Sequence, residues 1–272
     1  MASPLAATTL LTEKSGRVKE ARKLSRRSVR AERRLFLAEG WKAVSEAAAL
    51  ADCLVEVFAN AEALDAHADL LGSLDVDVHL VDDRAAQSLS GAVNAQGLVA
   101  VCRFLDVPIR AALGDGTGTV VICADVRDPG NAGTVIRTAD AAGAHAVVLA
   151  GNSVDLYNDK TVRATVGSLF HLAVATETEP LAAIRAAQAA GYRVLAADGA
   201  GELDLFEVED ALAGPVAWLF GNEAWGLPEE LAAAADGRVS IPIYGQAESL
   251  NLATAAAVCL YASARVRGTV EA

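Results

Sequence analysis

The sequence predicts an α/β protein: a small α/β domain, then a larger domain with a mostly parallel sheet and helices on both of its faces. Strand-like apolar runs alternate with helix-like runs from residue 34 to residue 265, and this alternation is typical of parallel sheets. The stretch 107–118 contains Pro108 and three glycines, which interrupt the alternation. The chain has 272 residues, enough for two ordinary domains. We therefore expect domains at 1–106 and 119–272, joined by a linker at 107–118.

The first domain begins with a basic segment that we expect to be helical. Gly40 ends the apolar run that follows, and the Ala-rich stretch after it favours a helix. The expected strands are 34–39, 53–59, 76–81 and 98–103, and the expected helices are 11–28, 41–50, 61–71 and 82–89.

The second domain repeats the strand-and-helix pattern, with Gly143 and Gly191 ending two of its helices. The expected strands are 119–125, 144–150, 171–175, 192–197, 216–221 and 238–241, and the expected helices are 131–142, 159–166, 180–190, 228–235 and 250–265. The last helix has almost no polar face between Leu250 and Tyr261. We expect it to be buried nearly all round, by its own domain, by a partner subunit or by both.

Charge is distributed unevenly along the chain. The net charge is −12, but residues 1–42 hold eleven Lys and Arg against four Glu, which leaves +7 there and −19 for the remainder. A long basic segment on an otherwise acidic protein favours contact with a polyanion over a merely solvated helix face. The sequence therefore predicts nucleic-acid contact by the N-terminal segment.

Composition also limits the compartment and the chemistry. The cysteines, Cys53, Cys102, Cys123 and Cys259, lie far apart in apolar runs, so we expect buried free thiols in a reducing cytoplasm. No apolar run reaches the roughly 18–20 residues that a membrane helix needs, and the N-terminus lacks the basic segment of a signal peptide. The four histidines are scattered, and nothing in their spacing suggests a metal site.

Three polar, glycine-bearing loops each follow a predicted strand of the second domain. They span 125–134, 220–228 and 242–250. Any one of them is compatible with an ordinary turn and helix cap, and Asn131 has a side chain suited to capping. Because ligands in open α/β sheets bind beyond the carboxyl ends of the strands, three such loops in one domain indicate one shared site.

These loops resemble the three motifs of the SpoU (TrmH-type) class of SPOUT RNA ribose 2′-O-methyltransferases. The stretches 128–143, 219–227 and 241–261 carry the resemblance in the family's order. Ala224 stands where Gly is common and Tyr244 where other residues occur, and neither touches the central motif positions. The first domain is similar, more weakly, to the ribosomal-protein-like substrate-binding domain often fused to this class, through residues 36–46 and 94–101.

The resemblance implies a C-terminal trefoil knot, which is a rare exception to ordinary chain topology. It further implies S-adenosyl-L-methionine held in the knot by the backbone at Ala197, Gly221, Ile241 and Leu250. A homodimer formed through the C-terminal domain and a structured RNA substrate are also implied. That no membrane is a partner is expected from the short apolar runs.

The resemblance makes Arg137 central to the chemistry, either as a proton acceptor or as a cation that stabilises the forming alkoxide. We favour the second role, because a guanidinium stays protonated in proteins. Asn131, Glu223, Ser249 and Asn251 would then position Arg137, the ribose and the adjacent phosphate. Helix capping remains an alternative role for the two asparagines, and a salt bridge that shapes the loop is the alternative for Glu223.

The leading hypothesis is therefore an S-adenosylmethionine-dependent RNA 2′-O-methyltransferase, acting on ribosomal RNA ahead of transfer RNA. A non-catalytic RNA-binding or ribosome-assembly factor would bind RNA without turnover, and the presence of Arg137, Glu223 and Asn251 argues against it. A nucleotide-cofactor oxidoreductase would need a glycine fingerprint between a strand and a helix. The glycines of residues 114–118 instead precede a predicted strand.

Overall fold

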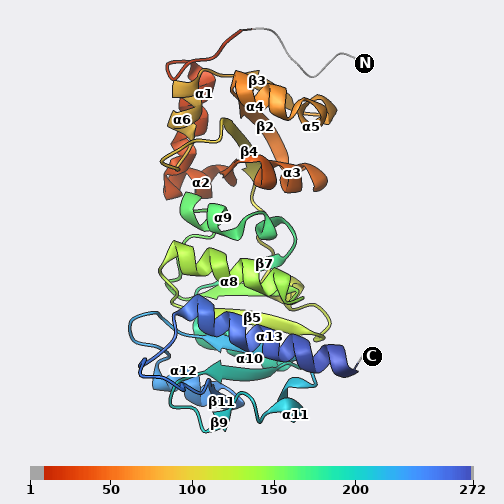
Figure 1. Cartoon of the computed structure of the whole chain (residues 1–272), viewed down its shortest axis with the longest axis vertical. Coiled ribbons are helices and arrows are strands. Elements are labelled where there is room, and N and C mark those ends of the chain that lie inside the picture. The colour runs from red at the N-terminus through yellow and green to blue at the C-terminus, as the bar shows by residue number, and fades with distance from the viewer. Residues whose placement is uncertain (1–8, 271–272) are drawn as a thin grey trace. The chain divides into compact units, whose positions relative to one another are not determined.

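The computed structural model describes residues 9–270, which fall into two compact units (Figure 1). Unit 1 consists of Met1–Leu105 together with Tyr157–Phe170, and unit 2 consists of Asp106–Leu156 and His171–Ala272. A segment from the middle of the chain therefore belongs to the unit formed by the N-terminal residues. Within residues 9–270, no helix has both the length and the apolar character needed to span a bilayer.

Unit 1 contains a four-stranded mixed sheet in the order β1-β4-β2-β3. Strand β4 pairs antiparallel with β1 and β2, and β2 pairs parallel with β3. The strands are β1 (Leu35–Glu39), β2 (Leu54–Ala59), β3 (Asp77–Leu80) and β4 (Leu98–Arg103), and the helices are α1 (Gly16–Arg22), the 3-10 turn η1 (Lys23–Ser25), α2 (Arg27–Arg33), α3 (Trp41–Ala49), α4 (Ala61–Ala66), α5 (Ala68–Ser73) and α6 (Asp83–Leu89). All four strands expected in this region are present.

The basic N-terminal segment is not the single helix that the sequence analysis predicts over 11–28. It forms α1, η1 and α2, with an extended Arg26 between the last two. The buried Arg30 side chain donates hydrogen bonds to the carbonyls of Leu24 (2.8 Å) and Ser25 (2.7 Å), which a continuous helix would have used itself. Val18 and Leu24 pack into the core between the sheet and α6, so the basic side chains around them face outward.

The segment contributed from the middle of the chain packs against the sheet of unit 1 through aromatic and ionic contacts. It contains α9 (Asp159–Thr165) and the 3-10 turn η2 (Ser168–Phe170). The Tyr157 ring lies 4.7 Å from the Phe36 ring and 3.8 Å from the Phe104 ring, and its hydroxyl accepts a hydrogen bond from the Leu105 amide at 2.6 Å. Tyr157, Val162 and Leu169 of this segment are buried. Apolar burial therefore fixes this segment on unit 1.

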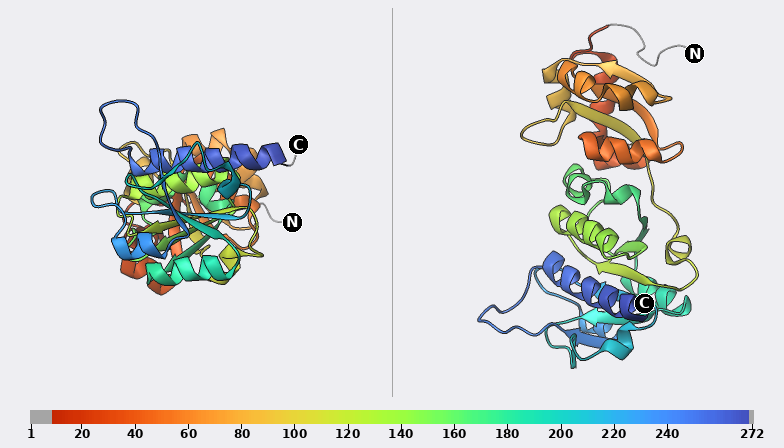
Figure 2. Two further views of the ribbon diagram at one scale, coloured as in Figure 1. Left: turned by 90° about the horizontal axis from the view of Figure 1, so that it is seen from below. Right: turned by 45° about the vertical axis from the view of Figure 1, so that its right-hand side comes forward.

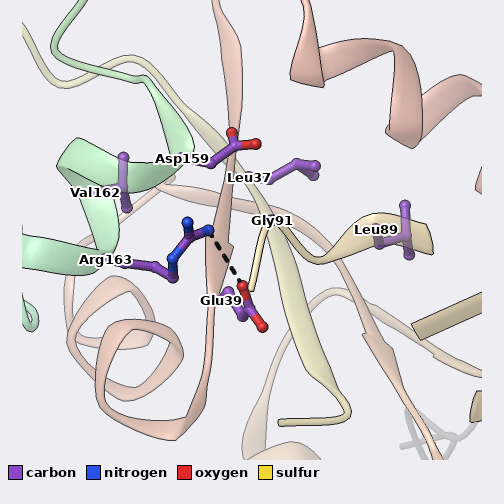
Figure 3. A pocket seen from close by; sticks show the side chains of 7 residues that line it. All are labelled: Leu37, Glu39, Leu89, Gly91, Asp159, Val162 and Arg163. Atoms are coloured by element: carbon purple, nitrogen blue, oxygen red, sulfur yellow. Dashed lines mark ion pairs between the residues drawn. The ribbon is translucent and has the colours of Figure 1, made fainter. Parts of the chain in front are cut away.

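Arg163 of α9 faces Glu39 of β1 across a small cavity of about 10 Å³, with an Nη1 to Oε2 distance of 3.6 Å (Figure 3). The Glu39 side chain is only 7% exposed, and it also accepts a hydrogen bond from the Ser90 hydroxyl. Gly91 closes this cavity, and a Cβ atom there would lie 2.5 Å from Arg163 Nη1. The buried carboxylate is thus compensated by a partner from the inserted segment.

Unit 2 contains a seven-stranded sheet in the order β7-β6-β5-β10-β8-β11-β9, and every adjacent pair in it is parallel. The strands are β5 (Thr119–Ala124), β6 (Ala146–Ala150), β7 (Ala173–Glu177), β8 (Arg193–Ala197), β9 (Leu203–Asp204), β10 (Val216–Phe220) and β11 (Gly237–Ser240). The helices are α7 (Ile109–Leu113), α8 (Pro129–Ala141), α10 (Pro180–Ala189), α11 (Glu209–Leu212), α12 (Glu229–Ala234) and α13 (Leu252–Val270). The predicted α/β class and its mostly parallel sheet are confirmed.

Helices cover both faces of this sheet. Helix α10 packs against both α7 and α12, and all three helices contribute to the core on one face, which includes Val120, Ile122 and Leu219. On the other face, helix α13 packs along α8 and against β10. Figure 2 shows the two helices next to each other. The indole of Trp218 in β10 donates a hydrogen bond to the Ser263 hydroxyl of α13 at 2.9 Å.

Several elements differ from the expected ones. The stretch 107–118 contains α7, whose Ala112 and Leu113 are buried in the core of unit 2, and the residues on both sides of this helix are irregular. Strand β9 and helix α11 were not predicted, because both are very short and neither shows a clear apolar period. The four cysteines are buried and free, as expected.

A single chain buries only one face of the last helix, so the cover that the sequence analysis expects from a partner subunit stays a prediction. The buried side chains of this helix form one stripe, which includes Ala253, Ala256, Leu260 and Ser263. Leu252 and Val258 are half-buried, and Tyr261 is 54% exposed. The spacing of the buried residues corresponds to one helix face, so unit 2 covers only that face.

Candidate functional site

A cavity of about 330 Å³ opens in unit 2 beyond the carboxyl ends of β8, β10 and β11. Its size is that of an ordinary small-molecule pocket. It is lined by Ala197, Asp198, Gly199, Phe220, Gly221, Asn222, Glu223, Ala224, Gly226, Val239, Ile241, Ile243, Glu248, Ser249, Leu250, Leu252 and Ala255. Strands β10, β8 and β11 are consecutive neighbours in the sheet. The three segments that follow them therefore meet at one edge of the sheet, where parallel α/β proteins bind ligands.

Four of these lining residues, Ala197, Gly221, Ile241 and Leu250, are those that the sequence analysis assigns to the cofactor. Glu223 and Ser249, which it assigns to catalysis, line the cavity as well. Ser249 lies in the stretch 243–249, all of which is exposed in the single chain. Asn131, Arg137 and Asn251 are not part of the cavity wall.

Gly221 begins the turn that follows β10, and only glycine fits there. A Cβ atom at this position would lie 2.4 Å from the carbonyl carbon and oxygen of Gly226. The turn is closed by two backbone hydrogen bonds of 2.9 Å, from the Asn222 amide to the Gly226 carbonyl and from the Gly226 amide to the Asn222 carbonyl. Gly226 has a φ of +70°, a conformation that favours glycine. These contacts bring two backbone segments together at the edge of the cavity.

The Glu223 carboxylate connects this turn to the loop after β5. It accepts hydrogen bonds from the Arg127 amide (3.2 Å), the Asp128 amide (3.1 Å) and the Asn131 side chain (3.2 Å). Asn222 adds a hydrogen bond from its Nδ2 to the Asp125 carbonyl at 2.6 Å. The two loops are therefore held in a fixed relation by charge-assisted and neutral hydrogen bonds.

Asn131 and Asn251 complete a chain of side-chain contacts between the three motifs. Asn251 Nδ2 donates to Asn131 Oδ1 at 3.1 Å, and Asn131 Nδ2 donates to Glu223. The Asn251 Oδ1 also caps α13 by accepting from the amides of Ala253 (2.9 Å) and Thr254 (3.3 Å). Helix capping, the alternative role considered for Asn131, is wrong. Asp128 caps α8, with its Oδ1 2.8 Å from the Asn131 amide, because the helix begins at Pro129.

Arg137 lies on the exposed side of α8. Among residues 9–270 its guanidinium makes no hydrogen bond or ion pair, and it does not line the cavity of its own chain. It lies six positions after Asn131 along the helix, a rise of about 9 Å. A single chain thus presents the cavity and the Glu223 network, and displays Arg137 on an open helix face.

The chemistry of the cavity wall suits a cationic ligand with an apolar part. Asp198, Glu223 and Glu248 supply carboxylates, and Ile241, Leu250 and Leu252 supply apolar surface. Within residues 9–270, no cluster of His, Cys, Asp and Glu has the arrangement of a metal site. Burial, with the Glu223 charge, raises the pKa of the nearby Cys123 thiol to about 12, so this thiol stays protonated and is no nucleophile.

The sequence analysis missed several lining residues, chiefly Asp198, Gly199, Asn222 and Glu248. Asp198 and Gly199 directly follow β8, so the strand-end argument that selected the other loops would also have selected them. Asn222 and Glu248 lie inside loops that were singled out. Their positions in the cavity wall depend on the turn geometry, which the sequence pattern does not specify.

Comparison with known proteins gives two family matches. Residues 118–261 match the SpoU rRNA Methylase family, and residues 16–100 match the MRM3-like substrate binding domain. The first match covers more than half of the chain and contains all three loops. The second covers most of the N-terminal part of unit 1.

Individual relatives agree with these matches. The 23S rRNA (guanosine(2553)-2′-O)-methyltransferase RlmP of Bacillus subtilis (strain 168) is 32% identical over 91% of this chain and 96% of its own. The crystal structure of an AdoMet-bound rRNA methyltransferase from Sinorhizobium meliloti is similar with a TM-score of 0.84 and 35% identity, over 94% of this chain and 97% of that one. The SpoU methyltransferase AviRb from Streptomyces viridochromogenes, in complex with AdoMet, has a TM-score of 0.81 and 28% identity, over 94% and 100%. The family predicted from the three motifs is therefore confirmed, and the chain belongs to the SpoU rRNA methylase family.

Proposed function

We propose that this chain transfers a methyl group from S-adenosylmethionine to a ribose 2′-hydroxyl of ribosomal RNA. One observation carries the proposal: the residues of the family motifs after β10 and β11 line a single cavity, and Glu223 connects this cavity to the motif after β5. Relatives named as 23S rRNA 2′-O-methyltransferases favour ribosomal RNA over transfer RNA.

The cavity residues fit S-adenosylmethionine. When bound, this molecule supplies an electrophilic methyl group on a cationic sulfur. Backbone groups at Ala197, Gly221, Ile241 and Leu250 would hold it. The carboxylates of Asp198 and Glu248 complement its positive charge, since opposite charges attract more strongly in a partly enclosed site than in open water.

The 2′-oxygen would form a bond to the methyl carbon as the methyl–sulfur bond breaks and the hydroxyl proton passes to water, and Arg137 would stabilise the negative charge that develops on this oxygen. A ribose hydroxyl is a weak nucleophile, so the enzyme has to align it and offset the charge that develops on it. A guanidinium remains protonated, which makes Arg137 suited to charge stabilisation. Asn131, Glu223, Ser249 and Asn251 would position the ribose, its phosphate and the helix that carries Arg137.

We infer that the active form is a homodimer. Arg137 is exposed and absent from the cavity of its own chain, so a second copy would bring it to a cavity. Helix α13 packs on α8 and leaves Val258 half-buried and Tyr261 exposed, and this face supplies apolar surface for such contact. A charged substitution, Val258→Arg, should shift the sedimentation coefficient to that of a monomer and abolish transfer.

We further infer a division of labour along the chain. Residues 1–106 would bind RNA in the cytoplasm, residues 119–272 would carry out methyl transfer through a trefoil-knotted C-terminal region, and residues 107–118 would connect the two. The basic helices of unit 1 and the substrate-binding family match support the first role.

The test uses full-length protein, labelled methyl donor and total RNA from cells that lack the gene. Arg137→Ala should lower transfer at least about 100-fold without changing donor affinity measured by calorimetry. Arg185→Ala removes another exposed helix arginine, on α10, and should leave transfer unchanged. Mass spectrometry of the product locates the modified ribose.

Each outcome has a distinct meaning. Full activity of Arg137→Ala would remove this residue from the mechanism. RNA binding by the wild type without turnover would favour a non-catalytic RNA-binding factor. If the labelled methyl group appeared in transfer RNA alone, transfer RNA would be the substrate in place of ribosomal RNA.

A further inference from the structure

An exposed arginine and an exposed tryptophan lie against each other beside the cavity. The Arg127 guanidinium carbon is 5.0 Å from the centre of the Trp225 ring. Trp225 is 54% exposed, and its chain neighbours Ala224 and Gly226 both line the cavity. Arg127 is exposed and makes no ion pair with another residue in the range 9–270. Neither side chain is therefore used to stabilise the core of unit 2.

The backbone on both sides of this pair is fixed. The Arg127 amide donates to Glu223 Oε2 at 3.2 Å. The Ala224 amide donates to Asn222 Oδ1 at 2.8 Å, and the Asn222 and Gly226 amides each bond the other residue's carbonyl. The same contacts that shape the cavity therefore also hold the positions from which Arg127 and Trp225 project. A ligand that bound this pair would lose little free energy to ordering of the backbone.

An exposed indole beside a cavity costs solvation free energy unless something covers it. Unpaired RNA bases stack on aromatic rings and on the planes of arginine side chains. Arg127 also adds a positive charge, which attracts RNA phosphates, to a part of the chain that is otherwise acidic. The pair is flat, cationic and partly apolar, so it matches the flat face of a nucleobase together with the phosphate beside that base.

We propose that Arg127 and Trp225 form a stacking platform for one unpaired base of the substrate RNA, at the rim of the methyl-transfer cavity. The platform rests on the proposed function and adds a contact to it. The base is that of the target nucleotide or of its immediate neighbour, because the ribose has to reach the cavity. Stacking accepts every base, so the platform contributes affinity and orientation of the nucleotide, and leaves the choice of base to other contacts.

The experiment compares full-length wild type with Trp225→Ala, Trp225→Phe and Arg127→Ala. The matched control is Phe206→Ala, which removes an aromatic side chain of similar exposure, 51%, away from the cavity wall. The probe is a single-stranded RNA oligonucleotide that contains 2-aminopurine, whose fluorescence falls when it stacks. KM for ribosomal RNA, donor affinity by calorimetry and sedimentation are measured on the same proteins.

Trp225→Ala should raise KM for RNA by about 5- to 150-fold, as expected for loss of one stacked base. In this variant the fluorescence of 2-aminopurine should no longer fall, even at protein concentrations at which unit 1 still binds the oligonucleotide. Trp225→Phe should keep KM for RNA and the fluorescence decrease close to the wild-type values. Arg127→Ala should change both in part, and Phe206→Ala should change neither. Donor affinity and sedimentation should not change.

Two results would overturn the platform. One is unchanged KM and unchanged fluorescence in Trp225→Ala while the wild type methylates RNA, which leaves the proposed function intact. The other is a change of sedimentation in Trp225→Ala, which would make Trp225 a contact between subunits. If the wild type quenches the probe in a Trp225-dependent way but transfers no methyl group to any RNA, the proposed function fails and the platform stands.

Discussion

At the carboxyl end of β10, Gly221 has no room for a side chain. Gly221→Ala would place a methyl group 2.4 Å from the Gly226 carbonyl, so one of the two backbone segments has to move. We expect donor affinity to fall by at least about tenfold, measured by calorimetry. Gly214→Ala is the matched control, because a Cβ atom at Gly214 meets nothing within 4 Å. Equal affinity of the two variants would contradict a role of this turn in donor binding.

Glu223 is the second residue at which a small change should have a large effect. Its two oxygens accept from two backbone amides and from Asn131, so Glu223→Gln turns one acceptor into a donor that faces an amide. Loss of a hydrogen bond to a charged group is worth about 1.5–3 kcal/mol. We therefore expect kcat/KM to fall by about 10- to 150-fold.

The control for this prediction is Glu230→Gln, on the exposed face of α12. It should retain wild-type kcat/KM. If Glu223→Gln were as active as the wild type, the hydrogen bonds of the Glu223 carboxylate would not be needed for methyl transfer. The connection between the two loops would then depend on Asn222 alone.

At the scale of elements, the 157–170 segment should decide the stability of unit 1. Tyr157 is buried between Phe36 and Phe104, and truncation of such a ring costs about 3–5 kcal/mol. Tyr157→Ala should speed hydrogen exchange of the β1 and β4 amides. Tyr244→Ala, at an 88% exposed position, should change unfolding free energy by less than about 0.5 kcal/mol. Unchanged exchange in β1 would mean that the segment is dispensable for this unit.

The element scale also shows what the sequence pattern could predict. The long elements were found, because alternating apolar runs and glycine stops indicate strands and helices. The break in the basic helix at Arg26 was missed, since it depends on the Arg30 side chain reaching two carbonyls. That α9 belongs with unit 1 was also missed. Its apolar face is the same whichever sheet it packs on, so periodicity carries no information about the partner.

At the scale of the whole molecule, charge should govern RNA binding. Lys19, Arg22, Arg26 and Arg27 are exposed and, among residues 9–270, make no ion pair, whereas Arg33 is paired with Glu20 at 2.8 Å. Each lost phosphate contact lowers the slope of log K against log salt by about 0.7–0.9. The double variant Arg22→Ala, Arg26→Ala should therefore lower the slope for ribosomal RNA by about 1.4–1.8.

The matched variant for this prediction is Arg33→Ala. Its guanidinium is already engaged by Glu20, so its loss should change the slope much less. If both proteins showed the wild-type slope, the basic helices of unit 1 would not be the phosphate-binding surface, and the RNA contact would have to lie elsewhere.

The cavity wall could be anticipated from the sequence, but the position of Arg137 relative to it could not. Every residue assigned to the cofactor lies in one cavity wall, because strand ends of a parallel sheet meet at one edge whatever the intervening sequence. The placement of Arg137 outside that wall was not predictable in this way. Helix periodicity puts Arg137 and Asn131 on one element, but it does not say which face of α8 the rest of the chain leaves uncovered.

The origin of unit 1 from two separate parts of the chain has a consequence for synthesis. Residues leave the ribosome at about 5–20 per second, N-terminus first. A nascent chain that has emerged to residue 105 still lacks Tyr157 and Phe170, which cover Phe36. Unit 1 can therefore be completed only after β5 and β6 of unit 2 have also emerged. Until then the Phe36 side of the first 105 residues stays uncovered and accessible to chaperones.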